Sequence, residues 1–165
     1  MPTTTEWDAR IQAVWDDDGL SDDERIARID GLAAERPEDD ARALFERAGA
    51  RDSAGLEAEA EPLYRRALGG DLDDEHRTQA VIQLASTLRN LGRVEEAIDL
   101  LRTEYDRGPT APLHDATGAF YALALVSAGD AVAAASLALK TLAPHLPRYS
   151  RSVASYADEL GRDVD

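Results

Sequence analysis

The sequence predicts an all-α fold, and three observations lead to that prediction. The 165 residues are rich in alanine, leucine, glutamate and arginine, which favour helices. Glycine and proline are scarce within the stretches that show helical periodicity. Gly55, Gly92 and Gly129 recur at a spacing of 37 residues, which indicates a repeated unit. We therefore expect an α-solenoid of about three helical hairpins, with N-terminal helices before it and a C-terminal capping helix after it.

Five further columns align in the register of these glycines. They are Ala48, Ala85 and Ala122; Ala60, Ala97 and Ala134; Leu63, Leu100 and Leu137; Ala54, Leu91 and Ala128; and Leu68, Tyr105 and Leu142. The short connection at each glycine requires two antiparallel helices to cross closely. We therefore expect the alanines to permit the close approach of the two backbones, and larger side chains there to overpack the crossing.

The middle unit shows the two helices of a hairpin clearly. The first helix carries an apolar stripe of Val81, Leu84, Ala85, Leu88 and Leu91 and stops at Gly92. The second carries Val94, Ala97, Ile98, Leu101 and Tyr105 on one face, and Gly108 and Pro109 end it. In the first unit, Pro62 lies within the second helix, and we expect it to kink that helix or shorten its start.

This pattern resembles the tetratricopeptide repeat. The matching positions of the middle unit are Val81, Leu84, Ala85, Leu88, Ala97, Leu101 and Pro109. The departures are Arg47 and Arg51 at apolar positions of the first unit, and Gly118 and Ala138 at large-residue positions of the third. Over about residues 40–160, the run that includes QLASTLRNLGR is similar to the bacterial tetratrico peptide repeat group 5 family. The resemblance implies a dimeric helical interaction module without catalytic activity.

The two ends of the chain are expected to cap the repeats, because terminal repeats cannot bury their outer faces alone. Residues 1–37 are predicted to form a helical pair, and residues 38–165 one continuous domain of repeats with its capping helix. Ser21 and Glu24 have the spacing of a capping box at the start of the second helix. The expected apolar stripes are Trp7, Ile11, Val14 and Trp15; Ile26, Ile29 and Leu32; and, after Pro147, Tyr149, Val153, Tyr156 and Leu160.

Composition limits the classes of function. The net charge of −15 disfavours nucleic-acid and anionic-membrane binding, which both need basic patches. It indicates a solvated acidic surface or, alternatively, a basic partner. The absence of cysteine excludes disulfides and thiol catalysis. The N-terminus does not read as a secretory signal and no apolar stretch is long enough to span a bilayer, so we expect a cytoplasmic protein.

The first helices of the units are expected to line a concave groove that binds an unidentified partner protein or peptide. The candidate contacts are Arg42, Glu46, Gln79, Gln83, Ser86, Arg89 and Asn90. Gln83, Arg89 and Asn90 can hydrogen-bond an extended peptide, and Arg89 can pair with a carboxylate in bidentate geometry. The alternative is that these side chains only keep the face solvated.

The stretch TGAFYALALVSAG is apolar on nearly every side, which is typical of a buried helix. Neighbouring hairpins cover only part of such a helix, so we expect Phe120, Leu123 and Val126 to form a homodimer interface. The alternative is coverage by the C-terminal helix and its loop.

No nucleotide, hydrolase or metalloprotease motif is present, and we predict no cofactor, no metal and no enzyme activity. His76, His114 and His145 are far apart in the sequence and lie near predicted turns. The alternative function is a small-molecule or metal-dependent sensor or enzyme. It requires two of these histidines to come within reach of a carboxylate in one cleft.

Overall fold

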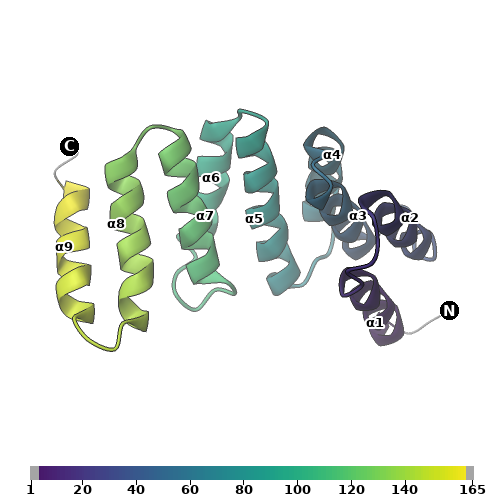
Figure 1. The fold of residues 1–165 in the computed structure, drawn as a ribbon, viewed down its shortest axis with the longest axis horizontal. Coiled ribbons are helices and arrows are strands. Elements are labelled where there is room, and N and C mark those ends of the chain that lie inside the picture. The colour runs from purple at the N-terminus through teal and green to yellow at the C-terminus, as the bar shows by residue number, and fades with distance from the viewer. Residues whose placement is uncertain (1–3, 163–165) are drawn as a thin grey trace. The chain divides into compact units, whose positions relative to one another are not determined.

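The computed structural model describes residues 4–162, and every regular element in that range is helical (Figure 1). The prediction of an all-α fold is therefore confirmed. The α-helices are α1 Thr4–Trp15, α2 Asp22–Ala33, α3 Ala41–Ser53, α4 Glu57–Leu68, α5 Asp74–Asn90, α6 Val94–Tyr105, α7 His114–Ser127, α8 Ala131–Leu142 and α9 Ser150–Arg162, with a short 3-10 turn at Ala143–His145.

The helices form two compact units, and each is described by itself. The N-terminal unit ends at Thr87 and the C-terminal unit begins at Leu88, so the division falls within α5. The predicted division between residues 37 and 38 stays a prediction.

The spacing of 37 residues is constant through only part of each helical hairpin. Helices α4, α6 and α8 begin at Glu57, Val94 and Ala131 and have 12 residues each. The helices before them end at residues 53, 90 and 127, but they begin at residues 41, 74 and 114, which are not equally spaced. The hairpin turn and the second helix therefore keep the register, and the links between units absorb the variation.

Each hairpin turn is closed by the same hydrogen bonds. Gly55, Gly92 and Gly129 have φ angles of 73°, 79° and 88°. The residue after each glycine donates its N–H to a carbonyl five residues earlier: Leu56 to Arg51, Arg93 to Leu88 and Asp130 to Leu125. This is the Schellman motif, in which glycine accepts the left-handed conformation that other residues resist.

Small residues are buried at the predicted crossings. Ala60, Ala97 and Ala134 are between 0% and 3% exposed, and their counterparts in the preceding helices, Ala48, Ala85 and Ala122, are buried as well. The prediction that these alanines do not face solvent is confirmed.

Pro62 does not shorten α4, contrary to one of the two expectations. Helix α4 begins at Glu57 and continues through Pro62 to Leu68, in register with α6 and α8. A proline at this position leaves the carbonyl of Ala58 without its helical donor. Both Pro62 and Ala58 are exposed, so water can hydrogen-bond that carbonyl.

The N-terminal helices pack around two tryptophans. Trp7, Ile11, Val14, Ile29 and Leu32 form one buried cluster with Trp15 against it. The Trp7 Nε1 donates to the carbonyl oxygen of Leu32 at 2.9 Å. The predicted capping box is present: the Ser21 side chain accepts from the Glu24 backbone N–H, and the Glu24 carboxylate accepts from the Ser21 N–H.

Arginines 47 and 51 depart from the apolar repeat pattern because they pair with the N-terminal helices. The Arg47 Nε lies 3.0 Å from Asp30 Oδ1, and the Arg51 Nη2 lies 2.8 Å from Asp30 Oδ2. Asp30 belongs to α2, so a carboxylate bound by two guanidiniums joins α2 to α3.

Gly118 stands at a large-residue position because α6 and α8 leave no room for a side chain. A Cβ atom there would lie 2.6 Å from the Thr141 Oγ1 and 3.0 Å from a ring carbon of Tyr105. Helix α7 therefore approaches Tyr105 of α6 and Thr141 of α8 through a residue that has no side chain.

Helix α9 packs against α8 as predicted, but through another face. Ala157 is fully buried, and its carbonyl oxygen accepts from the Ser136 Oγ at 2.6 Å. Tyr149 and Tyr156, which we expected on the packed face, are 76% and 64% exposed, and Leu160 is exposed too. The expectation was wrong because α9 approaches α8 through small residues, and the bulky stripe lies to one side of the contact.

Candidate functional site

Arg42 and Glu46 of α3 hold helix α1. Glu46 is 4% exposed, and its carboxylate accepts from the Trp15 Nε1 at 2.6 Å and pairs with Arg42. Arg42 also lies 3.8 Å from Asp8, and its guanidinium is 5.8 Å from the Trp7 ring centre. Burial lowers the pKa of Arg42, although Asp8 opposes that shift. In this arrangement α1 covers the two side chains, and Glu46 is not accessible to a partner.

A polar hollow of about 630 Å³ lies beside this contact. Its lining includes Arg36, Arg42, Asp8, Asp73 and His76. The His76 Nδ1 lies 2.5 Å from an Asp73 carboxylate oxygen, and Asp73 also accepts from the His76 backbone N–H. That backbone bond, more than the imidazole, lowers the pKa of Asp73. Asp73 thus acts as a cap at the start of α5.

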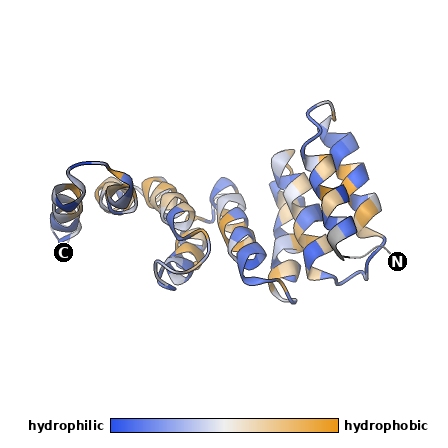
Figure 2. Cartoon of the chain, turned by 90° about the horizontal axis from the view of Figure 1, so that it is seen from below, coloured by the Kyte–Doolittle hydropathy of each residue, from blue (hydrophilic) through white to orange (hydrophobic). Residues whose placement is uncertain are grey.

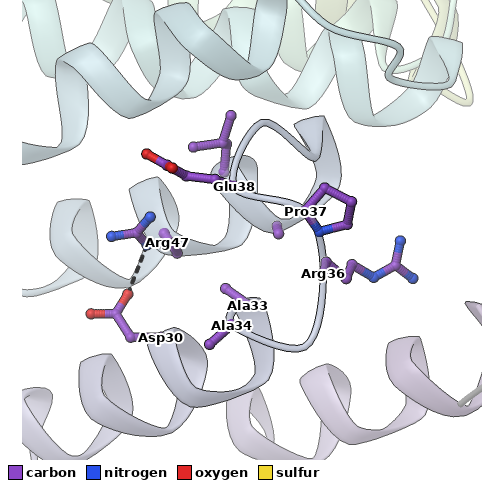
Figure 3. Close-up of a pocket in the computed structure, with 9 residues that line it drawn as sticks. Asp30, Ala33, Ala34, Arg36, Pro37, Glu38 and Arg47 are labelled. Atoms are coloured by element: carbon purple, nitrogen blue, oxygen red, sulfur yellow. Dashed lines mark hydrogen bonds and ion pairs between the residues drawn. The ribbon is translucent and has the colours of Figure 1, made fainter. Parts of the chain in front are cut away.

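A second hollow, of about 360 Å³, lies between α2, α3 and the loop that joins them (Figure 3). Ala33, Ala34 and Pro37 supply apolar surface, and Asp30 and Arg47 face each other at one side. Burial of Asp30 disfavours its charge, but the hydrogen bonds from Arg51 and Arg47 outweigh burial and lower its pKa. The charges of Asp30 and Arg47 are therefore paired within the N-terminal unit.

The candidate residues on α5 differ in their accessibility. Gln79, Gln83, Ser86 and Arg89 are half-buried, and Asn90 is exposed. Arg89 has no ion-pair partner among residues 4–162, whereas Arg42, Arg47 and Arg51 are all paired. Among the candidate arginines, Arg89 is thus the one whose guanidinium is best able to bind a carboxylate from outside the chain.

Gln83 belongs to a polar network that the sequence did not reveal. The Tyr64 hydroxyl lies 2.7 Å from the Gln83 Oε1 and 3.3 Å from the Asp52 carboxylate, and Thr87 donates to Asp52 at 2.9 Å. One phenol proton cannot serve both acceptors, so the network is complete if the Gln83 amide donates to the Tyr64 oxygen instead. Burial raises the pKa of Asp52 despite the donors Thr87 and Tyr64. Burial also raises the pKa of Tyr64.

This network was missed because its members come from three different helices. Asp52 is the penultimate residue of α3, Tyr64 lies in α4, and Gln83 and Thr87 lie one turn apart on α5. The four-residue spacing of Gln83 and Thr87 was the only local signal. Gln83 therefore contributes to the packing of α5, in addition to any role in binding.

The candidate interface residues on α7 are accessible in different degrees. Phe120 is half-buried, whereas Leu123 and Val126 are 47% and 56% exposed. The two units also differ in hydropathy. Helix α8 of the C-terminal unit is mostly orange to white, whereas blue residues are frequent on α1–α4 of the N-terminal unit (Figure 2). Helix α8 contains only one charged residue, Lys140.

The histidines belong to separate contacts. His76 pairs with Asp73 in the N-terminal unit, and the His145 Nε2 lies 2.9 Å from Asp115 in the C-terminal unit. His114 stacks on Tyr105 with ring centres 4.4 Å apart. Within residues 4–162, no three histidine or carboxylate side chains come together as a set of metal ligands.

The helical pairs, their glycine turns and the buried alanines at their crossings define a protein built from helical hairpin repeats. The family model described as tetratrico peptide repeat matches residues 41–160. The chain therefore belongs to the tetratrico peptide repeat family, as the sequence predicted. No curated protein and no solved structure matches the chain significantly. None of the helices in the described range has the length and apolar character needed to cross a membrane.

Proposed function

We propose that this protein is a non-catalytic protein-interaction module that associates with itself through apolar side chains of the C-terminal unit. The observation that carries the proposal is the exposure of Leu123 and Val126 next to the half-buried Phe120 on α7. Large apolar side chains that cluster on a surface usually mark a protein interface. Membership of a repeat family whose units present extended binding surfaces supports the same function.

Leu123→Glu tests the self-association. A charge in the centre of an apolar interface is expected to convert a dimer into a monomer of 17.9 kDa in light-scattering measurements. Leu56→Glu is the matched control, because Leu56 is an exposed leucine of the N-terminal unit. The proposal predicts that only Leu123→Glu changes the mass. A monomeric wild-type protein at high concentration would contradict it.

We also propose that α5 binds an extended peptide of a partner protein. Gln79, Ser86 and Asn90 supply hydrogen-bonding groups, and Arg89 supplies a guanidinium for a carboxylate or for peptide carbonyls. Arg42 and Glu46 are left out of this proposed surface because they are engaged with α1.

Arg89→Ala tests the peptide site. The expected result is a loss of captured partners from native cell extract with an unchanged melting temperature, because no internal ion pair is removed. Arg28→Ala is the control, since Arg28 is exposed on α2 and lies 3.7 Å from Asp17. Gln83→Ala is a poor test, because it also breaks the contact with Tyr64. Identical partners for both variants would count against the α5 site.

A further inference from the structure

The 37-residue register reveals one face of α8 that is uncovered, although the equivalent faces of α4 and α6 are covered. We define the α8 stacking face as Ala131, Ala135, Ala138 and Leu142. All four residues are exposed. The equivalent residues of the other second helices are at least half-buried. They are Glu57, Glu61, Tyr64 and Leu68 in α4, and Val94, Ile98, Leu101 and Tyr105 in α6.

In the other hairpins this face receives the first helix of the next unit. The hydroxyl of Tyr64 on α4 reaches Gln83 of α5. On α6, Tyr105 packs edge-on against Tyr121 of α7, and the Arg102 Nε donates to the Tyr121 hydroxyl at 3.1 Å. By this register, the helix expected on the α8 stacking face is α9.

Helix α9 occupies a different face of α8. Its polar contacts are with Ser136 and Lys140: the Ser136 Oγ donates to the carbonyl oxygen of Ala157, and the Lys140 Nζ lies 2.9 Å from Asp158. The equivalents of Ser136 in α4 and α6 are Pro62 and Asp99, which are both exposed. Helix α9 thus lies at a different position around α8 from the one that the repeat register predicts, and it leaves the α8 stacking face uncovered.

Helix α9 also leaves its own apolar residues uncovered. We define the α9 stripe as Tyr149, Val153, Tyr156 and Leu160, of which only Val153 is half-buried. The two open surfaces are complementary in size. On α6 a large residue, Tyr105, meets Gly118 of α7. At the α8 stacking face the alanines are the small side and the α9 stripe supplies the large side chains.

We propose that two copies of the chain associate about a two-fold axis, with the α9 stripe of each copy packed on the α8 stacking face of the other. A chain cannot satisfy its own face while Ser136 and Lys140 hold α9 elsewhere. A second copy supplies the missing stripe. Because the exchange is reciprocal, the dimer contains two identical contacts, and each contact buries one α8 stacking face and one α9 stripe. This inference rests on the self-association proposed above, and it adds a reciprocal α8–α9 contact between the two chains to the contact proposed for α7.

The first test is Ala138→Arg, measured by sedimentation equilibrium. Ala138 is exposed in the single chain, so the substitution is expected to leave the fold intact and to raise the dimer dissociation constant by roughly tenfold or more. Ala58→Arg is the matched control, since Ala58 is an exposed alanine of α4. Equal dissociation constants for the two variants overturn the inference.

The second test uses the absence of cysteine from the chain. Mixing an Ala138→Cys chain with a Tyr156→Cys chain is expected to give a disulfide between chains under mild oxidation. The double variant at low concentration, oxidised in the same way, reports the intramolecular alternative. Disulfides within single chains, without disulfides between mixed chains, would show that α9 moves onto its own α8 and overturn the proposal.

The outcomes separate this inference from the proposed function. If Leu123→Glu dissociates the dimer and Ala138→Arg does not, self-association stands and the α8–α9 exchange fails. A wild-type protein that stays monomeric at high concentration contradicts both, and leaves only the peptide site on α5.

Discussion

The two units carry the same repeat but present different surfaces. Residues 1–87 contain 22 acidic and 10 basic side chains, whereas residues 88–165 contain 11 and 8, so that the net charges are −12 and −3. Both tryptophans lie in the N-terminal unit. Of the large apolar side chains exposed in the described range, Leu56 is the one in the N-terminal unit, and nine lie in the C-terminal unit.

The comparison shows that the repeat specifies packing and leaves the surface free to vary. In the N-terminal unit, charged side chains are used in internal contacts such as Asp30 with Arg47 and Arg51. In the C-terminal unit the α8 stacking face is apolar and exposed, whereas the equivalent residues of α4 in the N-terminal unit are at least half-buried. The N-terminal unit is therefore stabilised by contacts within the chain, and the C-terminal unit has surface left for contacts between chains.

Among the substitutions that test this comparison, Trp7→Ala should have the largest effect on stability, because it removes the centre of the N-terminal core. We expect a loss of about 3–5 kcal/mol in the free energy of unfolding of the N-terminal unit. Trp15, the remaining tryptophan, reports that unfolding by its fluorescence in urea. Leu56→Ala serves as a control and should stay within about 0.5 kcal/mol of wild type. Similar losses for both variants would show that the tryptophan cluster is not the core of this unit.

Gly118→Ala should destabilise the C-terminal unit by about 1–3 kcal/mol, because the new methyl group would overlap Thr141 and Tyr105. The same substitution at Gly31 in α2 meets no atom within 4 Å and should stabilise by about 0.5–1 kcal/mol through helix propensity. Thermal unfolding followed by circular dichroism measures both. Effects of the same sign would mean that α7 does not need the close approach.

Asp30→Asn should lower the free energy of unfolding of the N-terminal unit by about 1–2 kcal/mol at pH 7, because it weakens charge-assisted hydrogen bonds from Arg47 and Arg51. The pKa of Asp30 is lowered in the folded state, so its contribution is present above the unfolded pKa and is lost as pH falls through the folded pKa. Urea unfolding at several pH values should show the variant and wild type converging in acid. A difference independent of pH would rule out the ion pair as its cause.

Asp52→Asn should change the free energy of unfolding by the smallest amount, and in the opposite direction from Asp30→Asn. The pKa of Asp52 is raised by burial, so its contribution is greatest below the unfolded pKa and is lost as pH rises through the folded pKa. The neutral amide should therefore be the more stable form at pH 7 and lose that advantage in acid. Urea unfolding at the same pH values measures this change. A variant less stable than wild type at pH 7 would indicate that the charged form is the one that Thr87 and Tyr64 stabilise.

The sequence predicted those features that depend on local conformation. Glycine at a left-handed turn and a Ser–Glu capping box are determined by neighbouring residues, and Gly55, Gly92, Gly129, Ser21 and Glu24 all adopt the predicted roles. The register of the second helices followed from the same glycines. Short-range physical requirements of this kind are visible in the order of the residues.

The sequence did not predict which of two faces a helix would use. Helix α9 carries a bulky apolar stripe and a neighbouring face of small residues that includes Ala157, and periodicity alone favoured the bulky one. Close backbone approach to Ser136 decided in favour of the small face. Likewise, Arg42 and Glu46 fit a solvated groove by their chemistry, and only the position of Trp15 shows that they hold α1.

The central proposal is that the C-terminal unit contacts other copies of the chain and the N-terminal unit does not. Hydrogen–deuterium exchange at increasing protein concentration tests it most directly. We expect amide exchange in α7, α8 and α9 to slow as the concentration rises, while exchange in α1–α4 stays constant. Slower exchange confined to α1–α4, or exchange that is the same at all concentrations throughout the chain, would contradict the claim.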